Sequence, residues 1–565
     1  MLRQGQADPR DLRFRYRLVG EPRAGLTSGD QHGVENLGDL LSRAYPYCCH
    51  QQRRFYSEPT SRRHRHNFAG ALGYQRSHPL LRLPRSVEAG FTYLPGTKHP
   101  ADCYPRPMGE LEERLARHTR QFVDRPMTPD ELQVIKRSVA DSYAGICASL
   151  ADTSILHKFS EVVTGPGAGS GIPVWGVGQE SSITDAVFLN AILARRSDLL
   201  NTYVSPTAMG VVHPSDNVAL ALVLGDWLKW TGKQFLASVN VLFNLSARFA
   251  DSYDPEIKGF DHDAAATFWV ALAAGQALGL SEAKLVEAQR IAGEFGFTSN
   301  QAAVGDVTDW KHCTYASGAM RGLQAARLAL AGFTGPASIY QGDFGADRFY
   351  RSGGMSFDAE PDLRTIIFKR WPALFYCQTP IDVARELSSR IGDVTDIRQV
   401  KVETYDRALR NGATPSADNP TSRAGRTHSI AYCVATALLK PVEYADFDAD
   451  RARDPQLRRL LGRISVTENS AMTKKFPSCT PCRISITLED GEVIRQGRDY
   501  SRGDPRDPLS DDEISDKVRR NLKGLTSPSN EEEIISGLWN AERLDGLAVL
   551  QAPLQQNRTR RGARE

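Results

Sequence analysis

The sequence predicts a mainly helical protein in which a large helical domain is followed by a smaller module of helices and strands. Two observations predict this fold class. Residues 110–332 are rich in Ala and Leu, and segment after segment has the apolar spacing of a helix. After about residue 366, apolar residues begin to alternate with polar ones, as they do in strands. A run of helices followed by such a module is typical of an α+β protein.

The helical block begins near Glu110, and its first long helix carries a complete start signal. Thr128 is placed to cap, Pro129 suits the first turn, and Glu131 lies three residues after the cap. Further helices are expected over residues 185–195, 215–230, 263–278, 282–295 and 316–331. The block is therefore nearly all helical.

Two of these helices show where their starts and their faces lie. Ser215 or Asp216 is placed to cap the helix over 215–230, which is apolar almost all round. A helix without a polar face belongs in a core. Ser281 is placed in the same way to cap the helix over 282–295.

The module after residue 366 combines strands with an apolar helix. Val400, Val402 and Thr404 alternate with polar residues as in a strand. Residues 483–488 and 493–495 flank an Asp-Gly turn, which predicts a hairpin. Helices are expected over residues 428–439 and 511–525.

These patterns divide the chain into five parts. They are a basic, poorly ordered extension (1–108), the helical domain (109–365), the α+β module (366–500), a helical segment that returns to the helical domain (501–545) and a disordered basic tail (546–565).

Composition places the chain among soluble globular proteins. Of its 565 residues 41% are hydrophobic and 24% are charged. No apolar run reaches the roughly 18 residues that a membrane span needs, so we expect no membrane contact. The net charge of +3 conceals a basic segment, because residues 1–95 hold 15 Lys or Arg against 8 Asp or Glu. A nucleic-acid-binding protein is the alternative that this segment raises, but the excess is small and no binding motif accompanies it. We therefore expect no nucleic-acid partner.

The first 108 residues and the cysteines bear on the compartment. A transit peptide is one interpretation of the Arg- and Ser-rich start, although acidic residues argue against it, so the expected location is cytoplasmic or mitochondrial. The nine cysteines are scattered and we expect free thiols. Cys479 and Cys482 form a single C-x-x-C pair, and without a second pair a zinc site is not expected.

The most informative stretch for chemistry runs from Asp198 to Asn217. It contains Asp198, Thr202 and His213-Pro-Ser, and it opens the apolar helix. Histidine is the usual acid or base near neutral pH, and a helix start can hold an anionic substrate on its free N–H groups. The alternative is that His213 merely occupies a turn while Ser215 caps.

Two lysines mark two further stretches. Lys311 precedes a helix of small residues, and Lys369 lies where the helical domain meets the α+β module. Two cationic side chains in one cleft would suit a polycarboxylate, because each ammonium group can balance one carboxylate. The alternative is that each lysine is solvated, and spacing alone does not decide whether they converge.

The order of these motifs resembles the MmgE/PrpD family, which includes 2-methylcitrate dehydratase and cis-aconitate decarboxylase. The resemblance covers roughly residues 110–540. Its anchors are Asp198-x-x-x-Thr202, His213-Pro-Ser-Asp-Asn217, Asp226-Trp227, Gly259-Phe-Asp-His262, Lys311, Lys369-Arg-Trp-Pro-Ala373, Gln378-Thr379, Asn419-Pro420, His428-Ser-Ile-Ala-Tyr432 and Pro508-Leu-Ser.

The resemblance implies a helical domain, a smaller α+β lid and an active site between them. It also implies a homodimer, no metal and no cofactor, and a small tricarboxylate as substrate. The catalytic residues that it implies are Asp198, Thr202, His213, Lys311 and Lys369. The substrate-binding residues that it implies are His262, His428 and Tyr432, and a helical spacing would put the last two on one face.

Within the family, the run from His213 and the run from Trp371 to Thr379 look more like the dehydratase than the decarboxylase. Leu200 and Asn201 stand where the family has an acidic residue before the Thr, and Tyr376 stands where dehydratases often have His. We interpret both departures as a less charged pocket, which predicts a substrate with a longer alkyl tail, similar to those of fungal maleic-anhydride pathways. The alternatives are cis-aconitate decarboxylation to itaconate and a family member without activity.

Overall fold

A computed structural model describes residues 109–164, 171–207, 210–296, 298–303 and 307–559. All of them fall in one compact unit, which spans Gly96–Glu565. The expectations for residues 1–108 lie outside the described residues. Within the described ranges, no helix is both long enough and apolar enough to cross a membrane.

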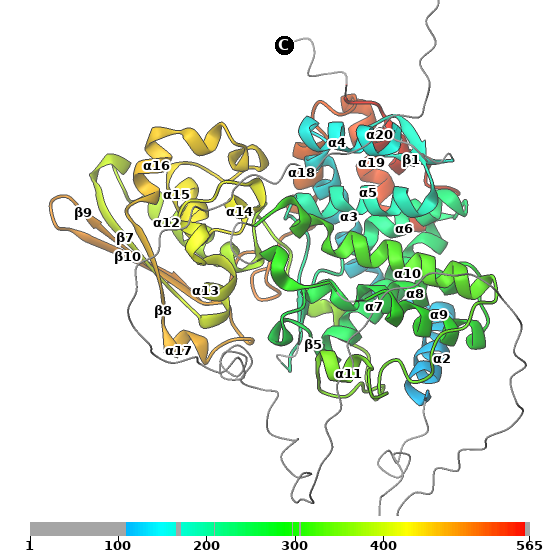
Figure 1. The fold of residues 1–565 in the computed structure, drawn as a ribbon. Coiled ribbons are helices and arrows are strands. Elements are labelled where there is room, and N and C mark those ends of the chain that lie inside the picture. The colour runs from blue at the N-terminus through cyan, green and yellow to red at the C-terminus, as the bar shows by residue number, and fades with distance from the viewer. Residues whose placement is uncertain (1–108, 165–170, 208–209, 297, 304–306, 560–565) are drawn as a thin grey trace, which may run out of the picture. The chain divides into compact units, whose positions relative to one another are not determined.

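The first part of the described chain is a helical domain (Figure 1). Its longer helices are α2 (Glu110–Asp124), α3 (Pro129–Ser149), α4 (Thr153–Thr164), α5 (Ile183–Arg196), α6 (Asp216–Trp227), α7 (Gly232–Ser252), α8 (Ala266–Ala277), α9 (Glu282–Glu294) and α10 (Thr314–Leu330). Helices α6 and α8 contribute buried residues from every side. The prediction that the helix over 215–230 lies in a core is therefore confirmed.

The start signals are confirmed at two of the three helices. Thr128 and Glu131 form a complete capping box at α3, and the Ser281 side chain caps α9. Ser215 makes no side-chain cap at α6. Its backbone is already helical, with φ −67° and ψ −13°, and its Oγ accepts a hydrogen bond from the Asn201 N–H at 2.9 Å. Ser215 thus ties the helix start to the segment that carries Asp198 and Thr202.

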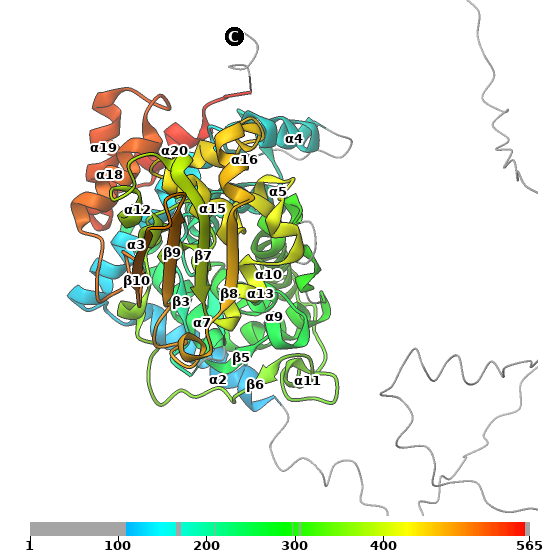
Figure 2. The ribbon, with the colours of Figure 1, turned by 90° about the vertical axis from the view of Figure 1, so that its left-hand side faces the viewer.

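The α+β module contains a four-stranded sheet in the order β10-β9-β7-β8. Its strands are β7 (Ile397–Thr404), β8 (Ile464–Glu468), β9 (Cys482–Leu488) and β10 (Val493–Arg498). The predicted hairpin is β9–β10, and β8 pairs with β7 in parallel. Figure 2 shows the sheet in front of α12 (Gln378–Ser388) and α15 (Ile430–Leu439). The helices cover one face, so the strands are half buried, as their alternation predicts.

Two hydrophobic cores underlie this division. One contains residues 111–368 and 509–554, and the other contains residues 367–494. After the sheet, α18 (Asp511–Leu522), α19 (Pro528–Trp539) and α20 (Ala548–Gln555) join the first core. The chain therefore leaves the helical domain and returns to it.

The end of the chain differs from the loose tail expected over residues 546–565. Helix α20 buries Leu550 and Leu554, and the guanidinium group of Arg558 donates to the carbonyl oxygens of Leu525 and Pro553 at 2.9 Å each. The expectation rested on the basic composition of this segment. A buried arginine that bonds backbone carbonyls instead stabilises the final turn. Residues 560–565 lie outside the described part.

Candidate active site

Two segments far apart in the sequence meet beside the C-terminal end of α5. Thr202 and Ile367 pair in an antiparallel bridge, and each N–H donates to the other carbonyl oxygen at 2.8 Å. Beyond the bridge, the Lys369 Nζ lies 3.9 Å from the Asp198 Oδ1. Backbone hydrogen bonds thus bring the stretch that begins at Asp198 next to the stretch around Lys369.

A small cavity lies beside this bridge, between the helical domain and the α+β module. Its volume is about 30 Å³, which is room for one or two water molecules. Its lining residues are Arg195, Asp198, Val211, His213, Glu256, His262, Ala303 and Lys311 from the helical domain, and Leu374, Phe375, Tyr376, Asn411 and His428 from the module. Five of the eight predicted site residues therefore converge here.

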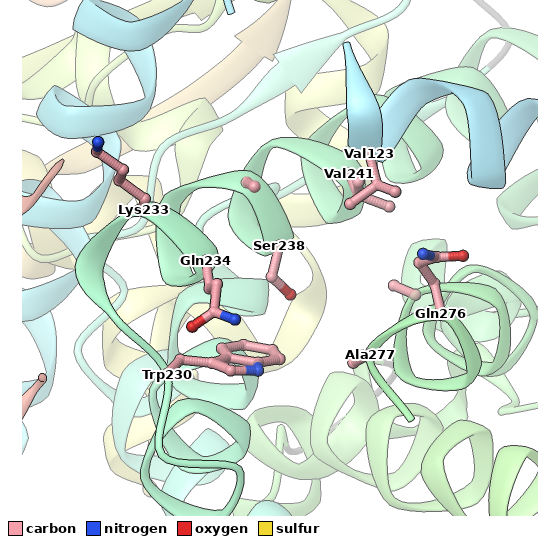
Figure 3. A pocket seen from close by; sticks show the side chains of 10 residues that line it. Val123, Trp230, Lys233, Gln234, Ser238, Val241, Gln276 and Ala277 are labelled. Atoms are coloured by element: carbon pink, nitrogen blue, oxygen red, sulfur yellow. The ribbon is translucent and has the colours of Figure 1, made fainter. Parts of the chain in front are cut away.

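A larger hollow of about 320 Å³ lies between α2, α7 and α8 (Figure 3). Apolar side chains dominate its lining, which includes Val123, Trp230 and Val241. Among the described residues that line it, Lys233 is the one with a charge, and none is a histidine or a carboxylate. The hollow thus offers no acid–base pair. The smaller cavity is the candidate active site because of its chemistry and not because of its size.

His213 lines the cavity as a neutral imidazole. Its Nδ1 lies 2.9 Å from the Asn201 carbonyl oxygen and 3.1 Å from the Thr202 Oγ1. A carbonyl oxygen can only accept, so Nδ1 carries the hydrogen and Nε2 is left without one. Burial, together with the charges of Arg195 and Lys369, holds the pKa of His213 well below its usual value. His213 therefore offers a free base nitrogen at neutral pH.

His262 stands next to it in the opposite electrostatic setting. The two rings are edge to face, with 5.2 Å between their centroids. Burial alone would lower the pKa of His262, but the carboxylates of Asp263 and Asp261 raise it to about 9. Two neighbouring imidazoles whose pKa values are shifted in opposite directions can serve as an acid and a base.

Arg195 and Lys311 place two cations on the cavity wall. The Arg195 guanidinium lies 3.2 Å from Asp216 and 3.9 Å from Asp263, and the Lys311 Nζ donates to the Asp261 Oδ2 at 2.6 Å. All five side chains are buried. The cations are thus held in fixed positions by carboxylates behind them, as preorganised binding of an anion requires.

Asp198 adopts a left-handed backbone conformation with φ 52°, which Asp tolerates better than most residues. Its Oδ2 lies 3.7 Å from the His428 Nδ1, beyond hydrogen-bond distance. Burial raises the pKa of Asp198, but His428 and Lys369 more than offset it, so the pKa stays below its ordinary value. Burial also lowers the pKa of Lys369 to about 8, with Asp198 opposing the shift.

His428 reaches the cavity and Tyr432 does not, which corrects the expectation that both line it from one helical face. His428 ends α14 (Arg423–Thr427), whereas Ser429 caps the separate helix α15. The His428 Nδ1 donates to the Ala424 carbonyl oxygen at 2.9 Å, and burial lowers its pKa to about 4. The Tyr432 hydroxyl donates to the Asp446 carbonyl oxygen at 2.8 Å, inside the second core.

Thr202 and Lys369 stand behind the cavity wall and not on it. Thr202 contacts the His213 ring, and Lys369 contacts Asp198. The spacing of the motif could not separate side chains on the wall from those that support it, because both kinds lie within a few residues of each other.

The departure at Leu200 and Asn201 does not make the pocket less charged. Leu200 belongs to the first hydrophobic core. The Asn201 side chain donates to Ser138 Oγ at 2.9 Å and accepts from the Ser215 N–H at 3.1 Å. Both side chains therefore face the fold. Only Tyr376, the second departure, lines the cavity.

Several lining residues had no signal in the sequence. Arg195 ends a predicted helix, but the sequence does not show that it is buried. Glu256 and Asn411 lie in short elements, η2 (Glu256–Lys258) and α13 (Asp406–Gly412), that no periodicity announces. They reach the cavity only because the chain folds back over it.

One group of side chains in the described part has the spacing of a metal site. Asp261, His262 and Asp263 offer ligand atoms that all lie within 4.8 Å of one another. Lys311 already bonds Asp261, and Arg195 lies beside Asp263. The carboxylates are therefore balanced by cations of the chain itself, and a divalent ion would have to displace them.

Histidines with oppositely shifted pKa values and buried cations thus lie together at the boundary of the two cores. The chain belongs to the MmgE/PrpD family: the family's N-terminal domain matches residues 113–358, and its C-terminal domain matches residues 371–541. The family assignment and the fold class predicted from the sequence are confirmed.

Curated relatives carry two activities in their names. The human cis-aconitate decarboxylase is 26% identical over 447 residues, which cover 75% of this chain and 90% of the relative. The 2-methylcitrate dehydratase of Cupriavidus necator is 25% identical over 374 residues, 60% of this chain and 75% of the relative. The 2-methylcitrate dehydratase of Escherichia coli K12 is 25% identical over 431 residues, which cover 69% of this chain and 85% of the relative. This chain is thus similar to lyases of two kinds.

Proposed function

We propose that this protein is a lyase that dehydrates a 2-alkylcitrate to the 2-alkyl-cis-aconitate and needs no metal. The observation that carries the proposal is the pair of adjoining imidazoles. His213 presents a nitrogen without hydrogen, and His262 has a pKa raised to about 9. A dehydration needs both functions, because one proton leaves carbon and another joins the departing hydroxyl group.

In the proposed reaction, the Nε2 of His213 removes the proton from the carbon beside a carboxylate. Arg195 and Lys311 hold the substrate carboxylates and balance the negative charge that develops. The C–O bond to the hydroxyl group breaks, and a proton from His262 converts the leaving group to water. His213 ends protonated and His262 ends neutral. A proton passed between the rings restores both.

The contact between Arg195 and His262 suggests how substrate prepares the acid. The Arg195 Nη2 lies 2.8 Å from the His262 Nε2, and since arginine only donates, the contact is made with the neutral ring and competes with the carboxylates that raise the pKa of His262. A substrate carboxylate draws the guanidinium toward itself. The ring is then free to take up its second proton between Asp261, Asp263 and Glu256, the carboxylates that face it.

An apolar section of the wall supports the alkyl part of the proposal. Val211, Ala303, Leu374 and Phe375 line the cavity together with the ring of Tyr376. Each buried methylene group of a substrate gains roughly 0.8 kcal/mol from such a wall. Citrate itself has no alkyl group to use it.

Substrate must enter by a movement of the α+β module. A cavity of about 30 Å³ is far below the ~300 Å³ or more of ordinary ligand sites. Arg407 of α13 pairs with Glu256, and the Ser422 hydroxyl donates to the Val307 carbonyl oxygen, so both contacts join the module to the helical domain. We propose that they break when the site opens and re-form over bound substrate, which excludes water during the reaction. A homodimer, as the family resemblance implies, is part of the same proposal.

Decarboxylation of cis-aconitate to itaconate is the second candidate. It is favoured by the decarboxylase relative, which covers a larger share of this chain than either dehydratase above. The same cations could hold cis-aconitate. The identities differ by only one percentage point, so they do not separate the two activities. The motif runs from His213 and from Trp371 are the reason to favour the dehydratase.

The test offers purified protein three acids side by side, with and without EDTA: 2-methylcitrate, a longer 2-alkylcitrate and cis-aconitate. Ultraviolet absorbance of the unsaturated product and NMR identify what forms. Dehydration of an alkylcitrate that EDTA does not slow supports the proposal. Itaconate and CO₂ from cis-aconitate would replace it with the second candidate. No turnover of any acid would contradict both.

A further inference from the structure

We propose that Lys517 of α18 is a positioning residue for the acid–base site, although it lies outside the cavity. Its ammonium group carries three hydrogens, and each one has an acceptor. The acceptors are the Asp141 Oδ1 at 2.6 Å, the Lys369 carbonyl oxygen at 2.8 Å and the Leu199 carbonyl oxygen at 3.1 Å. The lysine is 2% exposed, so no hydrogen bond to bulk water competes.

The two carbonyl groups belong to the two segments that the site needs side by side. One is that of Lys369 itself, and the other follows Asp198 directly in the chain. The side chains of Lys369 and Asp198 are 3.9 Å apart. The Thr202–Ile367 bridge joins the same two segments at a second point. Lys517 therefore fixes the distance between Asp198 and Lys369 through the backbone that carries them.

Stability alone is a poor explanation for this lysine. Asp141, its partner on α3, is fully buried, and a buried ion pair often contributes no more than an apolar pair of the same size. An apolar pair could not donate hydrogen bonds to two backbone carbonyl groups. The geometry thus points to a role in alignment.

The test rests on the proposed function and uses the full chain. The variant Lys517→Met/Asp141→Asn removes both charges, so no lone carboxylate stays buried. The matched control is Lys136→Met/Glu542→Gln. That pair, 2.7 Å apart, also starts from α3, but it joins α3 to η12 (Ala541–Arg543) and not to the site.

The Met/Asn variant is expected to lose about 10²-fold in kcat on the preferred alkylcitrate while staying folded, because small displacements of catalytic groups have effects of that size. KM is expected to change much less. The control is expected to keep its kcat within about twofold, since it touches no site carbonyl.

A second readout is the alkaline limb of the pH–rate profile. The charged and titratable groups that face Lys369 are Asp198, Arg195, Asp216, Lys517, Asp141, His213 and His428. The positive charge of Lys517 helps to lower the pKa of Lys369. The double variant also removes the Asp141 carboxylate, which opposes this effect, so the limb is compared between Lys517→Met/Asp141→Asn and Lys517→Gln/Asp141→Asn, which carry equal charge. If methionine lets Asp198 move away from Lys369, the limb of the Met/Asn variant is expected at lower pH, because Asp198 raises the pKa of Lys369.

A folded Met/Asn variant with kcat within twofold of wild type and with the same limb as the Gln/Asn variant would overturn the inference. If the Met/Asn variant does not fold, Lys517→Gln/Asp141→Asn takes its place. Its amide can still donate to a carbonyl oxygen, so a smaller kcat loss is expected, and a kcat within twofold of wild type again overturns the inference.

If wild-type protein is inactive on every acid, the proposed function fails and a separate measurement judges the inference. The chain has 15 lysines, so ¹³C-lysine NMR can follow Lys369, assigned through Lys369→Met. A lower pKa of Lys369 in the Met/Asn variant than in the Gln/Asn variant supports the inference. The same pKa in both proteins contradicts it.

Discussion

Replacing His213 tests the proposed base most directly, and His213→Gln is the appropriate change. The glutamine amide can still donate to the Asn201 carbonyl oxygen, which now accepts from the His213 Nδ1 at 2.9 Å. The variant therefore retains one polar contact and lacks the basic nitrogen. We expect its kcat to fall by ~10² to 10⁴, the usual contribution of a general base.

The free energies separate a chemical effect from a structural one. At about 1.36 kcal/mol for each tenfold change, the expected loss raises the barrier by about 2.7 to 5.4 kcal/mol. Even a complete loss of the hydrogen bond to the buried Asn201 carbonyl oxygen would cost about 1 to 3 kcal/mol of folding stability. The variant should thus unfold within a few degrees of wild type while losing most of its turnover.

The assay follows product absorbance with an alkylcitrate, and thermal unfolding is measured on the same samples. His157→Gln is the matched control, because His157 is an exposed histidine of α4. The control should keep wild-type turnover. A His213→Gln protein that is folded and turns over within a few-fold of wild type would refute the role of His213 as the base.

Three further predictions follow from the site. Activity should fall as pH rises through about 8 to 9, where Lys369 and His262 lose their protons, and the depressed pKa of His213 should keep the base active below pH 6.5. A pH–rate profile measures both limbs, and an acid limb at or above pH 6.5 that does not come from Asp216, whose pKa burial raises to about 7, would exclude His213 as the base. Tyr432→Phe should lower the free energy of unfolding by about 1 kcal/mol and leave kcat unchanged, because the hydroxyl group donates to the Asp446 carbonyl oxygen in the second core. A large loss of kcat without a loss of stability would show that Tyr432 belongs to the site. Leu374→Ala should favour longer alkyl tails, by about fourfold in relative kcat/KM for each extra methylene group that is buried. Competition between two alkylcitrates measures this ratio, and an unchanged ratio would mean that the tail does not contact Leu374.

The comparison of sequence and structure shows how the site was only partly predictable. Asp198, His213, His262, Lys311 and His428 were named from motifs and all line one cavity. Tyr432 was named by the same reasoning and lies in the second core. The error came from treating residues 428–439 as one helix. The break at Ser429 turns His428 and Tyr432 to different sides, and a local spacing rule cannot detect it.

The sequence by itself determined what depends on neighbours along the chain. The capping box at Thr128, the all-round apolar helix α6 and the hairpin β9–β10 are set by residues a few positions apart. The interactions that stabilise them join residues close in the chain, so their patterns can be recognised in the sequence. The order of motifs that marks the family is legible for the same reason.

The tertiary structure alone decided which side chains meet. The parallel pairing of β7 with β8 and the bridge from Thr202 to Ile367 join residues far apart in sequence. So do the three bonds of Lys517. The pKa values of His213 and His262 move in opposite directions because burial and neighbouring charges differ by a few ångströms in space. No pattern along the chain encodes those distances, and acid–base chemistry depends on them.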